Sequence, residues 1–538
     1  MIKRFKELNM LKITNLSYGF PDKELYNDIC FTIDDKEHAV LVGSNGTGKS
    51  TLINIIMDDE KYMYDGKIEM DEGIRIGYVP QYVTHAGTQT VYDFLAEPFV
   101  TMQSAADKIC EEMATAEDMN AAYQKYQECI DEIEAVDGYN FDTNIRKNLS
   151  VAGLDKITDL TVDKISGGEY KLISIIKNML LKPQLLIMDE PDVFLDFENL
   201  VGFAKLINQY EGAILAITHN RLLLNQCFNK VLHLENMELQ EFPGTFEEYN
   251  LSMLETKVLM QEQASKEEEW IETQKKLVEK LRKEATRIDS PAKGKQLKAR
   301  VTYLERLQER KTPNPFIEEH DYEFSFTYGC NDDDNTKTDE LEIKDYSLAF
   351  DRTLLENVSF KVGAGDKIAI VGANGTGKSS MLNDIYNNYC DKETTGFFTQ
   401  IYSDNEQLSG GEKNLKQLRN ISKTATTLLL LDEPTSHLDT YAQLALEKAI
   451  DEYEGAVVMV SHDFFTVCNC ANRILLIEDR TIRELSGRAF RKMIYKNYFD
   501  SDIFEKEKKL KEKEITINNL LKSGKIKEAK DKITNLTV

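Results

Sequence analysis

The sequence predicts an α/β fold in which two similar domains stand in tandem, joined by a long α-helical hairpin and followed by a charged helical tail. Three observations lead to this prediction. A set of short motifs occurs twice along the 538-residue chain. Each set begins with a glycine-rich loop placed between an apolar strand and a helix start. A stretch rich in Glu, Lys, Leu and Gln separates the two sets. A chain of this length has room for two or three domains, each with its own core.

Four pairs of motifs establish the internal repeat: Gly43–Ser50 with Gly372–Ser379, Ser166–Glu169 with Ser409–Glu412, Asp189-Glu190 with Asp432-Glu433, and His219 with His462. The last three pairs lie 243 residues apart and the first pair 329, so the second copy lacks 86 residues after its glycine-rich loop. We therefore predict domains at 1–247 and 316–498, a linker at 248–315 and a tail at 499–538. A helical subdomain at about 94–164 is expected in the first domain, and only a shortened one in the second.

The two glycine-rich loops have the pattern of phosphate-binding P-loops. Glycines allow successive backbone N–H groups to turn toward phosphate oxygens, and the following helix adds the partial positive charge of its N-terminus. Lys49 and Lys378 are expected to reach the β- and γ-phosphates, and the hydroxyls of Ser50 and Ser379 to bind Mg²⁺. Two such loops in matching strand–loop–helix context make coincidence an unsatisfactory explanation.

Two acidic pairs follow apolar strands at the positions where hydrolysis needs them. Asp189 and Asp432 are expected to hold the magnesium shell, while Glu190 and Glu433 polarise a water in line with the γ-phosphate. His219 and His462 each follow a further apolar strand and would contact the γ-phosphate and the attacking water. A single strand-end acid or histidine is more often structural, so the prediction depends on the whole constellation occurring twice.

With these repeated motifs the sequence resembles the ABC ATPase family. The resemblance implies two tandem ABC-type P-loop ATPase domains. The SGGE segments match the family's signature, and Gln81 and Gln400 match its Q-loop, which the family places at the magnesium ion. Phe20 and Phe350 stand where the family stacks an aromatic ring on adenine. The resemblance implies ATP and Mg²⁺ as cofactors and composite sites that pair each P-loop with the other domain's signature. The implied nucleotide contacts are Phe20, Gly43, Ser44, Asn45, Gly46, Thr47, Gly48, Lys49, Ser50, Thr51, Gln81, Ser166, Gly167, Gly168 and Glu169, with Phe350, Gly372, Ala373, Asn374, Gly375, Thr376, Gly377, Lys378, Ser379, Ser380, Gln400, Ser409, Gly410, Gly411 and Glu412.

The linker sequence predicts a helix of about 40 residues, a tight corner at Ser290-Pro291 and a return helix of about 20. From Arg282 to Lys311 it has ten Lys and Arg against four Asp and Glu, although the whole chain carries a net charge of −26. Two ABC domains with such a linker resemble the ABC-F subfamily. That resemblance implies a ribosomal partner, with Arg282–Arg300 reaching rRNA and peptidyl-tRNA, and either a translation-factor role or antibiotic ribosomal protection.

Several positions depart from the subfamily's pattern. Asp192, Val193 and Phe194 interrupt the loop after Glu190, which leads us to expect a disturbed approach of this loop to the opposite domain. The second domain keeps the usual residues from Glu433 to Asp439. Ile165 stands for the signature leucine, and Asn220 follows His219 where Asp is usual. Unequal hydrolysis at the two sites is therefore expected.

Composition narrows the remaining alternatives. No apolar run approaches the roughly 18–20 residues that span a bilayer, and eight scattered cysteines without a CxxC pair indicate reduced thiols. We expect a cytoplasmic monomer whose two domains pair within one chain. The alternatives are the ATPase subunit of a membrane transporter, which would not require the basic linker, and a DNA-repair or chromosome-type ATPase, which would carry a much longer coiled coil or zinc modules.

Overall fold

The computed structural model describes residues 9–21, 23–71, 73–81, 87–113, 118–193, 195–287, 298–302, 324–329, 341–350, 353–399 and 410–498, with 513, 516–517, 520–521, 523 and 525–534 in the tail. The chain divides into two compact units. One consists of Met1–Gly244 and Asp321–Phe499, and the other of Thr245–His320 and Asp500–Val538. No helix among the described residues is long and apolar enough to cross a membrane.

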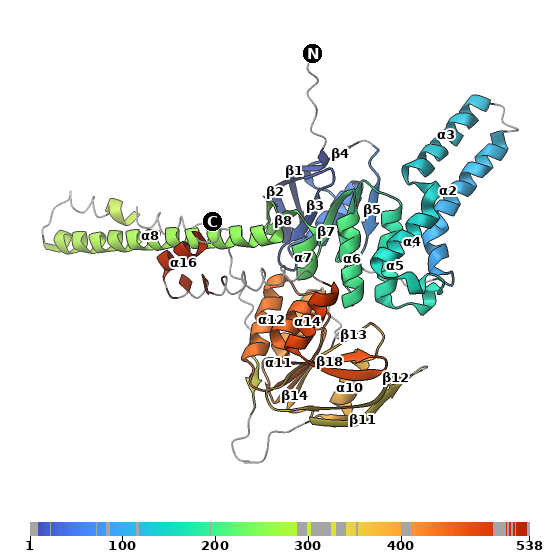
Figure 1. Ribbon diagram of the computed structural model, residues 1–538. Helices are drawn as coiled ribbons and strands as arrows, with labels where there is room; N and C mark the ends of the chain where they lie inside the picture. Colours follow the sequence, from blue (N-terminus) through green and yellow to red (C-terminus); the bar gives the residue numbers. More distant parts are fainter. Residues whose placement is uncertain are drawn as a thin grey trace. The chain divides into compact units, whose positions relative to one another are not determined.

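Two six-stranded sheets of the same topology form the centre of the first unit (Figure 1). The first has the order β5 (Ile76–Val79), β6 (Leu185–Asp189), β7 (Ala213–Ile217), β3 (His38–Val42), β8 (Lys230–Glu235), β9 (Glu238–Pro243). The second has the order β14 (Thr395–Phe398), β16 (Leu428–Asp432), β17 (Ala456–Val460), β13 (Lys367–Gly372), β18 (Arg473–Glu478), β19 (Thr481–Ser486). Neighbouring strands are parallel except at β8–β9 and β18–β19. The predicted α/β fold with an internal repeat is confirmed.

The carboxyl ends of these strands place the functional residues. Strands β6, β7 and β17 are buried throughout, as expected for parallel strands covered on both faces. Because β3 lies beside β7, and β7 beside β6, the P-loop, the acidic pair and the histidine emerge at one edge of the sheet. Helices α1 (Lys49–Met57) and α10 (Lys378–Tyr389) continue from the two P-loops.

Antiparallel strands complete each half. Strands β2 (Lys23–Asp34), β1 (Asn9–Phe20) and β4 (Asp65–Met70) form a three-stranded sheet whose apolar face packs into the core of the first half. In the second half β11 (Leu341–Ala349) pairs with β12 (Thr353–Val362). A short parallel pair joins β10 (Thr327–Tyr328) to β15 (Ala425–Thr426).

The helices differ between the halves at the place where the sequence predicts a difference. The first half contains α2 (Val91–Met113) and α3 (Met119–Ala135), which form a hairpin (Figure 1), and then α4 (Phe141–Ala152) and α5 (Gly167–Leu180). Helices therefore occupy much of the region, about 94–164, where we expect a helical subdomain. In the second half only residues 399–409 separate β14 from α11 (Gly410–Ile421), which leaves no room for a counterpart of α2 and α3. The remaining helices are α6 (Phe197–Gln209), α7 (Arg221–Cys227), α12 (Thr440–Glu452), α13 (Phe464–Cys470) and α14 (Gly487–Tyr498), with 3-10 turns η1 (Asp59–Lys61), η2 (Gly138–Asn140), η3 (Asp155–Ile157) and η4 (Val162–Lys164).

The second unit is built on α8 (Phe246–Arg287), a helix of 42 residues where the sequence predicts about 40. Residues from the tail, including α16 (Ile526–Thr534), pack on it. Their small core consists of Leu254, Val258, Ile517, Leu521, Ala529 and Ile533. Lys530 Nζ lies 2.7 Å from Glu262 Oε2 beside this core. The predicted corner at Ser290-Pro291, with Lys293 and Lys295, lies outside the described residues, as does the return helix beyond residue 302.

Candidate active site

Left-handed glycines shape both P-loops. Gly46 and Gly48 have φ of 79° and 96°, and Gly375 and Gly377 have 74° and 91°. A Cβ atom at Gly48 would lie 2.7 Å from the Tyr26 hydroxyl oxygen, and that hydroxyl donates a hydrogen bond to the Gly48 carbonyl. The loop therefore needs glycine both for its backbone conformation and for the close approach of Tyr26.

The P-loop lysines are buried and held by their own loops. Lys49 Nζ donates to the carbonyls of Gly43 and Ser44, both at 2.9 Å, and Lys378 Nζ to those of Gly372 and Ala373, both at 2.8 Å. Burial lowers the pKa of both ammonium groups, and the neighbouring carboxylates oppose this effect. An anionic phosphate at the loop would compensate the buried charge, so the two lysines fit the triphosphate of ATP.

A hydroxyl and a carboxylate meet at each predicted magnesium position. Ser50 Oγ donates to Asp189 Oδ1 at 3.2 Å, and Ser379 Oγ donates to Asp432 Oδ1 at 2.9 Å. Burial raises the pKa of Asp189 to about 6, an effect that the hydrogen bond from Ser50 reduces. A divalent cation favours the ionised carboxylate and prefers oxygen ligands, so each pair fits Mg²⁺ supported by nucleotide phosphates.

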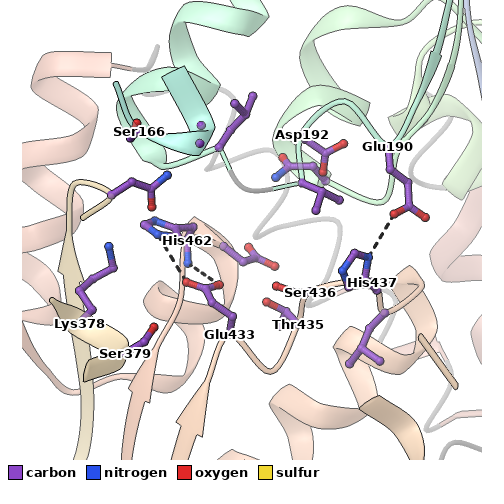
Figure 2. Close-up of a pocket in the computed structure, with 18 of the residues that line it drawn as sticks. Ser166, Glu190, Asp192, Lys378, Ser379, Glu433, Thr435, Ser436, His437 and His462 are labelled. Carbon is purple, nitrogen blue, oxygen red and sulfur yellow. Dashed lines mark hydrogen bonds and ion pairs between the residues drawn. The ribbon is translucent and has the colours of Figure 1, made fainter. Parts of the chain in front are cut away.

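The first signature lies opposite the second P-loop. A cavity of about 510 Å³ is lined by Ser166, Gly167 and Gly168 on one side and by Lys378 and Ser379 on the other (Figure 2). The Ser166 side chain accepts a hydrogen bond from the Glu169 backbone, and the Glu169 side chain accepts one from the Ser166 backbone, which caps the N-terminus of α5. This helix end is suited to bind the γ-phosphate of a nucleotide held by the second P-loop.

The second signature lies against the first P-loop in the matching way. A Cβ atom built on Gly411 would lie 2.2 Å from Asn45 Nδ2, and the same Nδ2 donates to the His437 carbonyl at 2.8 Å. Gly410, at the N-terminus of α11, and Glu412, in its first turn, continue this signature. Ser409 and the Q-loop residue Gln400 lie outside the described residues. Each P-loop therefore faces the signature of the other domain.

The loop after each predicted catalytic carboxylate also crosses between domains. Asp439 Oδ2 accepts from the Asn45 backbone N–H at 3.3 Å, and Asp196 Oδ2 accepts from the Asn374 backbone N–H at 3.0 Å. The prediction that Asp192, Val193 and Phe194 disturb this approach is therefore wrong at Asp196. The physical reason is that Asp196 caps α6 through the Asn199 N–H, so the helix end positions it independently of the preceding residues. Phe194 itself lies outside the described residues.

The two acidic residues predicted to activate water have different neighbours. Glu433 accepts from the His462 backbone N–H at 3.2 Å, and its Oε1 lies 3.5 Å from His462 Nε2. Glu190 accepts from Gln81 Nε2 at 2.5 Å and pairs with His437 Nδ1 at 3.3 Å (Figure 2). Both glutamates have left-handed backbones, with φ of 44° and 52°. Such strain in a non-glycine residue is common at functional sites.

The surroundings of the two carboxyl groups shift their pKa values in opposite directions. Burial alone would raise the pKa of Glu190, but the hydrogen bond from His437, the charges of His219 and His437, and the hydrogen bond from Gln81 lower it to about 2. Burial raises the pKa of Glu433, and Lys378 only partly offsets this. The two sites therefore differ in the pKa of the glutamate that is expected to activate water.

The remaining predicted residues lie at the edges of the sites. Phe20 and Phe350 are 48% and 67% exposed as whole residues, so both are accessible for stacking on a base. His219 is buried, and within the described residues its Nε2 has no hydrogen-bond partner, as expected for a side chain that awaits a phosphate or water. His437, Asp439 and Asp196 are site residues that the sequence did not predict. Asp196 and Asp439 occupy equivalent positions in the two copies of the repeat, which was the available signal for them, whereas the position of His437 is taken by Phe194 in the first copy.

The comparisons with known proteins agree with this geometry. The ABC transporter family model matches residues 26–193 and 355–398, and a second model with the same description matches 232–326. The energy-dependent translational throttle protein EttA of Haemophilus influenzae is 27% identical, over 85% of this chain and 89% of its own. The ABC transporter F family member 5 of Arabidopsis thaliana is 24% identical, over 97% and 81%.

A solved structure shares the tandem fold. The complex of an archaeal ribosomal stalk protein with the recycling factor aABCE1 contains a chain that is 15% identical, with a TM-score of 0.54, covering 92% of this chain and 98% of that one. The duplicated P-loops, acidic pairs and signatures make this protein an ATPase that uses ATP and Mg²⁺. The chain therefore belongs to the ABC ATPase family, within its ABC-F subfamily.

Proposed function

We propose that the protein acts on the ribosome during translation, using ATP to change between an open and a closed arrangement of its ABC domains. The observation that supports this most directly is the alignment with the translational throttle protein, which runs through both ABC domains and the linker. This similarity covers 85% of this chain and 89% of the relative.

The proposed cycle assigns each duplicated element of the repeat a role. Two ATP–Mg²⁺ molecules bind between a P-loop and the opposite signature, which brings the two domains together. Glu190 and Glu433 orient the attacking waters, and His219 and His462 contact the γ-phosphates. Hydrolysis removes the γ-phosphate that each signature helix binds, and the domains separate.

The linker is the part that we propose to contact RNA. Helix α8 has 42 residues, which corresponds to roughly 60 Å of helix. Arg282 and Lys283 near its end are exposed, as are Lys298 and Arg300 after the predicted corner. A cluster of this kind attracts phosphate backbones without reading a sequence. We propose that it reaches the tRNA and peptidyl-transferase region, in a translation-factor role or in antibiotic ribosomal protection.

The experiment that tests this proposal traps the closed state. A Glu190→Gln, Glu433→Gln double variant should bind ATP without hydrolysing it and should sediment with ribosomes in ATP but not without nucleotide. A Lys49→Ala, Lys378→Ala variant is the matched control, because it should lose both ATP binding and cosedimentation. Retained ATP binding without cosedimentation would reject the ribosomal proposal and favour a membrane or DNA partner.

A second variant separates the linker from the ATPase domains. Replacing Arg282, Lys283, Lys298 and Arg300 with Gln in the trapping background should weaken cosedimentation and make it less dependent on salt, because fewer phosphate contacts release fewer counterions. In the chain that keeps Glu190 and Glu433, the same four substitutions should leave ATP hydrolysis without ribosomes unchanged. An unchanged salt dependence would show that these four residues do not contact RNA. Toeprinting of the trapped complexes, with and without ribosome-directed drugs, distinguishes a translation-factor role from antibiotic ribosomal protection.

A further inference from the structure

One side chain of the second domain reaches the catalytic carboxylate of the first. His437 Nδ1 lies 3.3 Å from Glu190 Oε2, and the two residues are 247 positions apart in the chain (Figure 2). Both side chains are largely buried, with 14% and 17% exposure. Because Glu190 is an acceptor at neutral pH, the contact requires His437 to donate from Nδ1.

The loop that carries His437 is held in place by the first P-loop. Asn45 Nδ2 donates to the His437 carbonyl at 2.8 Å, and Asp439 accepts from the Asn45 backbone at 3.3 Å. Asp439 also caps α12 by accepting from the Ala442 N–H at 2.8 Å. The imidazole therefore reaches Glu190 through a loop that is docked on the opposite domain, and this contact requires the two domains to be together.

The first domain has no equivalent of this imidazole. Aligning Glu190–Asp196 with Glu433–Asp439 places Phe194 at the position of His437, and a phenyl ring has no N–H to donate. Glu433 is instead paired with His462 of its own domain. The asymmetry of the two loops in sequence thus coincides with an asymmetry in how the two carboxylates are held.

We propose that His437 is a positioning residue that acts across the domain interface to orient Glu190, so that hydrolysis at the first site depends on this contact and hydrolysis at the second does not. The inference rests on the proposed role of Glu190 in orienting water. Gln81 and His437 both contact Glu190 Oε2, which leaves Oε1 for the water. Loss of one of the two contacts would allow the carboxylate to rotate away from the in-line position, and placement errors of this size reduce turnover strongly.

The test measures each site separately in purified protein without ribosomes, so its outcome is independent of the partner. A Glu433→Gln background reports the first site, and a Glu190→Gln background reports the second. Each background is combined with His437→Phe, which copies the first domain's residue, and with His437→Asn, whose amide can still donate a hydrogen bond. Single-turnover hydrolysis of radiolabelled ATP gives the rate constant for hydrolysis and the apparent KM for each combination.

We expect His437→Phe to reduce the first-site rate roughly tenfold with little change in KM, and His437→Asn to restore most of it. His437 also lines the cavity at the second P-loop, so in the background that reports the second site we expect both variants to lose activity, but clearly less than at the first site. Equal losses in both backgrounds would indicate a general effect on the domain interface and overturn the proposal. An unchanged first-site rate in His437→Phe would also overturn it, as would full hydrolysis by the Glu190→Gln, Glu433→Gln double variant.

Discussion

Replacing Arg221 with Met should destabilise the unit that contains the two ABC domains. Arg221 lies in α7, and its guanidinium contacts Glu447 and Asp463 of the second domain, the latter at 3.0 Å. The side chains of Arg221 and Glu447 are each only 5% exposed. The guanidinium also lies over the Phe465 ring, 5.0 Å from its centroid. Methionine keeps much of the apolar length but removes the charge, so the buried carboxylate of Glu447 and the partly buried one of Asp463 would lose their counter-ion.

The size of the effect follows from what the carboxylates retain. Removing one partner of a buried ion pair costs about 3–5 kcal/mol. Glu447 keeps hydrogen bonds from Thr466 Oγ1 and Asn469 Nδ2, both at 2.9 Å, which places the expected loss near the lower limit. We therefore expect a loss of about 3 kcal/mol in the free energy of unfolding, or a decrease of about 3 °C in melting temperature for a unit of this size.

Differential scanning calorimetry of the nucleotide-free protein checks this value. Arg146→Met is the matched control, because Arg146 pairs with Asp142 at 3.2 Å while 65% exposed, and such surface pairs contribute about 0.5 kcal/mol or less. Adding Glu447→Met to Arg221→Met should recover part of the loss, because it removes a buried charge. If Arg221→Met and Arg146→Met shift the melting temperature equally, the buried network is not a source of stability and the reasoning fails.

Three further predictions concern a P-loop, the second unit and a titrating histidine. Gly48→Ala should abolish ATP binding at the first site alone, because its Cβ would lie 2.7 Å from the Tyr26 hydroxyl oxygen at a φ of +96°; a fluorescent nucleotide should then bind once per chain, and binding at both sites would contradict this. Ala529→Asp should loosen the small core on α8 by several kcal/mol, because it buries an unpaired carboxylate, and should speed proteolysis of α16; an unchanged cleavage rate would exclude this packing. Burial lowers the pKa of His462 in the folded protein to about 3, whereas the same side chain in the unfolded chain has a pKa of 6.5. As the pH falls below 6.5, the unfolded chain therefore binds a proton at this residue while the folded protein does not. Stability should therefore decrease between pH 6.5 and about 3, by about 2 kcal/mol at pH 5. His462→Gln should remove this part of the pH dependence, and an identical pH profile of melting temperature in both proteins would refute the assignment.

Much of the first site was predictable from residues close together in the chain. The strand, glycine-rich loop and helix around Lys49 form one continuous segment, so their order in the sequence determines the geometry that receives a phosphate. The acidic pair at Asp189 and the histidine at His219 follow strands whose parallel pairing brings their ends together. The repeat extended each prediction to the second domain.

The local sequence predicted less well where a helix end determines the position of a side chain. The sequence of the Asp192–Phe194 segment suggested that its loop would not reach the other domain, yet Asp196 contacts Asn374 at 3.0 Å. The cap at the start of α6 determines the position of Asp196, and its effect on the opposite domain depends on how the domains pair.

The sequence by itself determined the repeated fold, the nucleotide-binding motifs, the shortened second helical subdomain and the long linker helix, because each depends on local patterns and on comparing one copy with the other. Only the tertiary structure decided which residues meet across the domains. His437 reaches Glu190 over 247 positions, and Arg221 reaches Glu447 over 226. Residue periodicity and motif spacing report neighbours within a strand or a helical turn, whereas these contacts arise only when two separately folded sheets pack against each other.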